Sequence, residues 1–226
     1  MKIVIFGATG MVGRGALLEA LDSSMVDTVL TVGRKEAEIA HPKLQQILHS
    51  DFENFEAIAD QLTDLDACLW CLGVSSAGMS EEDYTRITYD FALNAAKELL
   101  AKNPEMRFCF VSGAGADSSE KGCTMWARVK GKTENDLMKM PFKEVVIFRP
   151  AFIKAERGSK PRGALYGIMY AIFGVFSPIF RAFGGATSTT EVGQAMVLAA
   201  AGESTKQMLD SRDINSLAAR MKEVVS

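Results

Sequence analysis

Short hydrophobic runs alternate with longer segments of helical periodicity through the first 150 residues of the chain. Short runs bounded by turn residues are typical of buried strands, whereas apolar residues three or four positions apart are typical of helices. The expected strands are 2–6, 28–32, 44–49, 66–72, 107–112 and 143–149, and the expected helices are 11–22, 54–62, 81–102 and 121–139. This alternation predicts an α/β fold, a Rossmann-type doubly wound parallel sheet covered by helices on both faces.

The pattern changes after Pro150. A loop that contains Gly and Arg comes first, followed by an uncharged apolar segment over 163–180 and then by shorter elements. We therefore expect a Rossmann core over residues 1–150 and a small C-terminal region over 151–226, which completes the fold and forms the substrate or partner surface.

A glycine loop follows the first expected strand. The apolar run KIVIF leads directly into GATGMVG, residues 7–13, and a helical pattern comes next. In such a strand–turn–helix unit the glycines permit a tight turn, a close approach to a pyrophosphate and packing of helix on strand, and the helix N-terminus faces the phosphates. The dinucleotide contacts expected here come from Gly7, Thr9, Gly10, Met11, Val12 and Gly13.

The residues after the second and third strands bear on the choice of dinucleotide. An NAD site usually has Asp or Glu about 20 residues past the loop, whereas an Arg accommodates the 2′-phosphate of NADP. Arg34 stands at that place, so the sequence favours NADP(H). Arg14 either adds a second positive charge or is a solvated residue at the helix start. Asp51 and Phe52 either border the adenine or simply end the third strand.

Composition excludes some classes of function. The chain has 25 Lys and Arg against 28 Asp and Glu, a formal net charge of −3, which gives no basic surface for nucleic acid. The opening residues MKIVIFGATG do not have the long apolar run and small-residue cleavage site of a secretory signal, so we expect a cytoplasmic location.

The cysteines and histidines do not suggest a metal site. Cys68 and Cys71 read C-x-x-C, but residues three apart on a strand point to opposite faces of a sheet. The two histidines, His41 and His49, have no set of other ligands near them in the sequence. We therefore expect no bound metal.

Several motifs occur in an order typical of one family. They are GATGMVGR at 7–14, CLG at 71–73, VSGAGAD at 111–117, KGKTE at 130–134 and FRPAFI at 148–153. With them, nearly the whole chain resembles the atypical short-chain dehydrogenase/reductases, in particular the oxidoreductase family named after the human HIV Tat-interacting protein, and also NAD(P)-binding epimerase-like bacterial proteins. The resemblance implies bound NADPH and a site made from Ser112, a Tyr-x-x-x-Lys pair and the Arg-Pro loop, with Gly73 and Pro150 beside the cofactor.

The chain departs from the family at the catalytic tyrosine. By resemblance, Ser112 takes the family's serine position and Lys130 that of the lysine that holds the nicotinamide ribose, but Trp126 stands where the tyrosine should be. That tyrosine is the general acid or base, with its pKa lowered by the lysine ammonium. An indole N–H only donates hydrogen bonds and does not release its proton at usable pH, which puts ordinary carbonyl reduction in doubt.

Other residues are candidates for the remaining family positions. Thr88 is the candidate for the helix asparagine, and Tyr84 or Tyr89 for a substitute phenol. Ser75 and Ser76 either border the cofactor or substrate or belong to an ordinary Ser-rich turn.

Three functions and several partners stay open at this stage. The first is an NADPH-dependent oxidoreductase of a small apolar substrate, the second a non-catalytic NADP(H)-sensing regulator, and the third a sugar-nucleotide epimerase-like enzyme, which needs the same missing tyrosine.

The apolar segment 163–180 is long enough to span a membrane, but Gly167, Gly174 and Pro178 weaken a spanning helix. We expect it to form a pocket lid or the surface of a homodimer, with peripheral membrane contact as the alternative.

Overall fold

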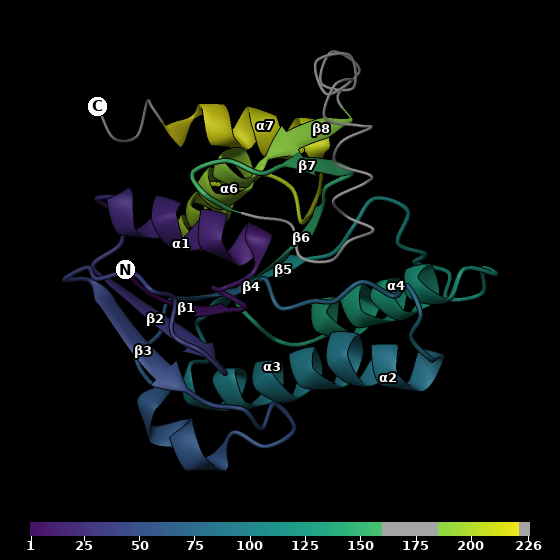
Figure 1. The fold of residues 1–226 in the computed structure, drawn as a ribbon, viewed down its shortest axis with the longest axis horizontal. Coiled ribbons are helices and arrows are strands. Elements are labelled where there is room, and N and C mark those ends of the chain that lie inside the picture. The colour runs from purple at the N-terminus through teal and green to yellow at the C-terminus, as the bar shows by residue number, and fades with distance from the viewer. Residues whose placement is uncertain (160–184, 222–226) are drawn as a thin grey trace.

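Seven parallel strands form the central sheet of the computed structural model, which describes residues 1–159 and 185–221 (Figure 1). Their order is β3-β2-β1-β4-β5-β6-β9. The strands are β1 (Lys2–Phe6), β2 (Thr28–Gly33), β3 (Leu44–Leu48), β4 (Ala67–Trp70), β5 (Arg107–Val111), β6 (Glu144–Arg149) and β9 (Met208–Asp210), and a second parallel pair consists of β7 (Phe152–Lys154) and β8 (Ala186–Ser188). The expected doubly wound parallel sheet is confirmed.

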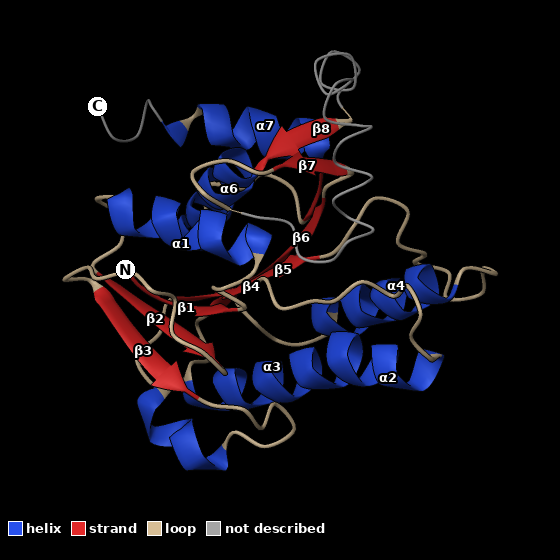
Figure 2. Cartoon of the chain, in the orientation of Figure 1, coloured by secondary structure: helices blue, strands red, loops and turns tan. Residues whose placement is uncertain are grey.

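Helices cover both faces of the sheet (Figure 2). They are α1 (Met11–Asp22), the 3₁₀ turn η1 (Glu56–Gln61), α2 (Glu81–Thr85), the π turn η2 (Arg86–Asp90), α3 (Phe91–Lys102), α4 (Met125–Met138), α6 (Thr189–Ala201) and α7 (Ser211–Ala219). Helices α1, α6 and α7 lie on one face, and α2, α3 and α4 on the other.

Alternate strand residues enter different cores. In β1, Ile3 and Ile5 pack with residues of α1 and α6, whereas Val4 and Phe6 pack with residues of α3 on the opposite face. A parallel sheet covered on both faces requires such near-continuous apolar strands. The period of two also separates the thiols as expected, because Cys68 belongs to one core and Cys71 packs against the other.

Two glycines let α1 and α6 pack backbone against backbone. A Cβ added at Gly15 would lie 2.5 Å from the carbonyl oxygen of Thr189, and one added at Gly193 would lie 2.8 Å from the carbonyl oxygen of Gly15. Both distances are shorter than van der Waals contact, so neither position has room for a side chain. The region after Pro150 thus supports the helix that follows the glycine loop, and it also supplies β9 beside β6.

Two helices differ from expectation. The run 81–102 is interrupted by the π turn η2, a local change that hydrophobic periodicity does not reveal. The helix expected from residue 121 begins at Met125. The Asp117 carboxylate accepts hydrogen bonds from the backbone N–H groups of Ser119 and Gly122, at 2.9 and 2.7 Å, and this turn competes with helix formation.

The apolar segment 163–180 lies outside the described residues. Within 1–159 and 185–221, no helix has the length and apolar character needed to cross a membrane. The same ranges contain no cluster of three or more side chains suited to holding a metal ion.

Candidate functional site

The glycine loop after β1 forms a closed turn. Gly7 has φ +80°, and a Cβ there would lie 2.6 Å from the backbone nitrogen of Leu72, just beyond β4. A Cβ at Gly13 would lie 2.1 Å from the carbonyl oxygen of Gly7, and that same oxygen accepts a hydrogen bond from Gly10 N at 2.9 Å. Glycine at these positions therefore lets the turn approach both the exit of β4 and the start of α1.

This turn leaves the N-terminus of α1 open to an anion. Gly10 is the N-cap and supplies no capping side chain, and no acidic residue stands in the first turn. Thr9, Met11 and Val12 are partly exposed around it. Strand β1 lies between β2 and β4, where the strand order reverses and doubly wound sheets bind their ligands. The cradle and the free helix N–H groups fit a dinucleotide pyrophosphate.

Two arginines flank this cradle. Arg34 follows β2 directly and is exposed, and it has no ion pair within the described part of the chain. Arg14 lies in the first turn of α1, where its Nε is buried without a hydrogen-bond partner among residues 1–159 and 185–221. A buried, unpartnered guanidinium nitrogen is costly, so a polar ligand at this place would relieve an existing penalty.

Asp51 and Phe52 point in different directions from the end of β3. The Asp51 carboxylate accepts hydrogen bonds from Glu53 N and Asn54 N at 3.0 and 3.2 Å, and the residue lines a hollow of about 320 Å³ together with His49 and Asn54. The Phe52 ring is 4% exposed and stacks on Phe91 with centroids 5.6 Å apart. Phe52 thus packs in the core, and Asp51 is the member of the pair that faces solvent.

Lys130 lies at the carboxyl end of β5. Its Nζ donates to the carbonyl oxygen of Val111 at 3.0 Å and lies 5.0 Å from the ring centroid of Phe110. Burial lowers the pKa of Lys130 to about 8, although the nearby Glu134 carboxylate acts in the opposite direction. The ammonium has three hydrogens, and the Val111 carbonyl oxygen accepts only one of them. The others remain available for a ribose hydroxyl.

Ser112 and Trp126 converge on the same edge. Ser112 Oγ is buried without a hydrogen-bond partner in the described chain, while its backbone N–H donates to Phe148 O at 2.7 Å. Trp126 stands one helical turn before Lys130 on α4, on the same side of that helix. Its six-membered ring lies against the loop after β5, 3.4 Å from where a Cβ on Gly115 would be. The structure therefore brings Ser112, Trp126 and Lys130 together.

Replacing Lys130 tests the cost of burying this ammonium. We expect Lys130→Met to stabilise the free protein by about 1–3 kcal/mol at pH 7, since the folded state holds the charged form less well than the unfolded state does. The charged Lys130 destabilises the folded protein fully below its folded-state pKa of about 8. This destabilisation disappears as the pH rises toward the ordinary pKa of 10.5. The gain should therefore shrink between pH 8 and 10.

Urea denaturation at pH 7 and at pH 9.5 measures this difference. Lys132→Met, which removes an exposed lysine of the same helix, is the matched control and should give no such gain. An equal difference between Lys130→Met and wild type at both pH values would show that the burial of charge is not the cause.

A buried ion pair ties α4 to the Arg-Pro loop. Arg149 Nε donates to both oxygens of Glu134 at 3.1 Å, and Arg149 Nη2 contacts the same carboxylate, which is 0% exposed. Arg149 Nη2 also donates to Ser118 Oγ at 2.7 Å, and Pro150 O accepts from Ala114 N at 2.9 Å. Sequence reasoning placed both charged residues inside motifs but did not pair them, because only the fold brings β6 to α4.

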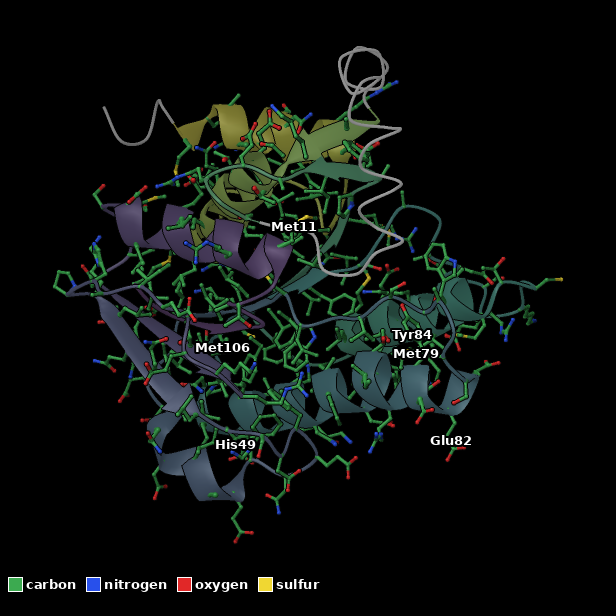
Figure 3. All side chains as sticks on the ribbon, in the orientation of Figure 1. Met11, His49, Met79, Glu82, Tyr84 and Met106 are labelled. Carbon is green, nitrogen blue, oxygen red and sulfur yellow. The ribbon has the colours of Figure 1, made fainter. Side chains whose placement is uncertain are left out.

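The two candidate substitute phenols, Tyr89 and Tyr84, both lie on the helical face that carries α2 and α4. Tyr89 Oη donates to Asp136 Oδ2 at 2.9 Å, and Lys132 Nζ lies 4.6 Å from its ring centroid. Desolvation and the Asp136 hydrogen bond raise the pKa of Tyr89. Tyr84 is 3% exposed and lies between α2 and α4 (Figure 3). The Tyr89 hydroxyl is therefore held by Asp136 rather than by Lys130.

The remaining candidates differ in burial and contacts. Thr88 is 2% exposed within η2, and its Oγ1 has no hydrogen-bond partner in the described ranges. Gly73 is exposed, with nothing within 4 Å of an added Cβ. Ser75 Oγ accepts from Ala77 N at 3.3 Å and Ser76 O accepts from Met79 N at 3.1 Å, as in a serine-rich turn.

Known proteins correct one expectation about this chain. FMP52 proteins of Meyerozyma guilliermondii, Candida albicans and Saccharomyces cerevisiae, to which the chain is similar, are named mitochondrial, so the expected cytoplasmic location is contradicted. That expectation depended on the lack of a secretory signal, which does not distinguish the cytoplasm from a mitochondrion.

The same comparisons identify the family. Residues 7–164 match the NAD(P)H-binding family. FMP52 of Candida albicans is 31% identical over 70% of this chain and 69% of that protein, and HTATIP2 of Rattus norvegicus is 27% identical over 69% and 64%. A short-chain dehydrogenase/reductase family oxidoreductase from Burkholderia thailandensis shares the fold, with a TM-score of 0.70 at 13% identity over 100% of this chain and 98% of that one. The chain belongs to the NAD(P)H-binding family, and its fold is that of a short-chain dehydrogenase/reductase.

Proposed function

We propose that the protein is an NADP(H)-dependent oxidoreductase of a small substrate that works without the tyrosine acid of its family. The observation that carries this proposal is the open N-terminus of α1 above the Gly7–Gly13 turn, with the exposed Arg34 following the adjacent strand β2. A positive residue there suits the 2′-phosphate, whereas a carboxylate would suit the ribose of NAD.

Lys130 and Ser112, at the carboxyl end of β5, have separate roles in this proposal. When bound, NADPH supplies the hydride. Lys130, one hydrogen of which is held by Val111 O, offers its other hydrogens to the nicotinamide ribose. Ser112 Oγ is the unpartnered group suited to hydrogen-bonding and polarising the oxygen of a substrate.

Arg34→Glu tests the cofactor preference. We expect wild-type protein to bind NADPH more tightly than NADH, and the variant to lose about 1.5–3 kcal/mol of that preference, roughly tenfold to a hundredfold. Fluorescence titration with both dinucleotides measures the ratio of the two affinities. Lys35→Glu makes the same charge change at the next exposed residue and should leave the ratio nearly unchanged. A ratio equally unaffected by both substitutions would exclude Arg34 as the discriminating residue.

A non-catalytic NADP(H)-sensing protein is the second candidate. Trp126 in the tyrosine position favours it, because an indole cannot act as the proton donor, and the Tyr89 hydroxyl is already held by Asp136. Retained NADPH binding together with no reduction of any carbonyl or quinone substrate would support this candidate over the enzyme.

A further inference from the structure

We propose that the site takes quinones, planar conjugated diketones, rather than isolated aldehydes and ketones. This inference rests on the proposed oxidoreductase function and names its substrate class. It follows from the pairing of an aromatic ring, Trp126, with an ammonium, Lys130, at the carboxyl end of β5.

The missing phenol matters much less for a quinone than for a ketone. Hydride addition to an isolated ketone gives an alkoxide, a strong base that needs a proton from a positioned acid as it forms. Hydride transfer to a quinone gives a hydroquinone monoanion, whose conjugate acid is a phenol with a pKa of about 10, as in tyrosine. Such an anion can leave the site unprotonated, so a site with Trp126 in place of tyrosine discriminates in favour of quinones.

The electron and proton balance closes without a further reactant. The quinone gains the hydride, with its electron pair, and becomes the hydroquinone monoanion, while NADPH becomes NADP⁺. Water supplies the one proton that the monoanion still needs after release. The overall reaction is quinone plus NADPH plus H⁺ giving hydroquinone plus NADP⁺.

The side chains at this edge fit the two features of a quinone. The partly exposed Trp126 indole rests on Gly113 and Gly115, where a Cβ would lie 3.9 and 3.4 Å from its six-membered ring. Indole is a favourable surface for stacking a flat conjugated ring. The Lys130 ammonium and the unpartnered Ser112 Oγ provide positive charge and a hydrogen-bond donor for an oxygen that becomes anionic.

Binding is tested without turnover. Menadione, a naphthoquinone, is titrated by calorimetry into the protein saturated with NADP⁺. We expect Trp126→Phe, which keeps an aromatic face, to bind within about threefold of wild type, and Trp126→Ala to bind roughly tenfold more weakly. The chain has two tryptophans, and Trp70 is fully buried, so quenching of the more exposed Trp126 fluorescence reports where menadione binds. Affinity unchanged in Trp126→Ala would overturn the proposed contact.

Turnover is compared for two ligands of similar size. Under anaerobic conditions, with the product identified by chromatography, we expect NADPH-dependent reduction of menadione by the wild type to exceed that of the monoketone 1-tetralone by about a hundredfold or more, after correction for the uncatalysed reaction. Equal rates, or no reduction of menadione by protein that binds NADPH, would overturn the quinone inference and leave the cofactor assignment standing. Failure to bind NADPH at all would instead overturn the proposed function.

Discussion

Trp126→Tyr should raise the NADPH-dependent reduction of simple aldehydes and ketones by about 10²–10⁴-fold, the usual contribution of a positioned general acid. The new phenol would stand one turn before Lys130 on α4, where the ammonium lowers the pKa of a neighbouring hydroxyl. Wild-type turnover of these substrates should be very low, because the indole cannot supply a proton to the nascent alkoxide. Steady-state oxidation of NADPH with a panel of carbonyl compounds measures both rates.

The matched control is Trp126→Phe, which has the new ring without its hydroxyl and should stay as slow as wild type. NADPH affinity and thermal stability are measured for both variants, since each removes ring volume. Two results would contradict the expectation. Vigorous wild-type carbonyl reduction that disappears in Tyr84→Phe or Tyr89→Phe would mean that another tyrosine is the acid. A Tyr variant that binds NADPH yet reduces nothing would show that the missing phenol is not the cause of inactivity.

Arg149→Met should destabilise the protein by about 3–5 kcal/mol, since it leaves the fully buried Glu134 carboxylate without its partner. Denaturation in urea at pH 7 measures the loss. Arg128→Met is the matched control, because Arg128 pairs from α4 with the exposed Glu81 and should contribute less than about 1 kcal/mol.

The double variant Glu134→Met/Arg149→Met tests whether the uncompensated charge causes the loss. Replacing a buried pair by apolar side chains of similar size is often neutral or stabilising, so the double variant should recover most of the stability. If it is as unstable as Arg149→Met alone, the loss comes instead from contacts of the arginine, such as the hydrogen bond to Ser118.

The sequence predicted the fold and the cofactor cradle because both depend on local patterns. The first six strands were found within a few residues, since each is an apolar run between turn residues, and the glycine loop is a contiguous motif. The order of Ser112, Trp126 and Lys130 came from a family resemblance, and the structure brings these residues to one edge.

Other features depend on contacts between distant segments. The Arg149–Glu134 pair and the Tyr89–Asp136 hydrogen bond join elements that only the packed fold places together. The sequence also left open whether Asp51 and Phe52 border the adenine or simply end the third strand, and only the packed fold shows that the Phe52 ring is buried. Pairings of this kind have no periodic signal along the chain.

The contact between α1 and α6 makes cofactor binding a property of the whole chain. The phosphates expected at the start of α1 would hold that helix in place. The same placement of α1 allows its close backbone contact with α6 at Gly15 and Gly193. Binding of a dinucleotide and folding of the C-terminal region are therefore thermodynamically linked, and each should make the other more favourable. Residues 1–150 alone would lack both α6 and strand β9, so we expect that they would not form an independently folded nucleotide-binding domain.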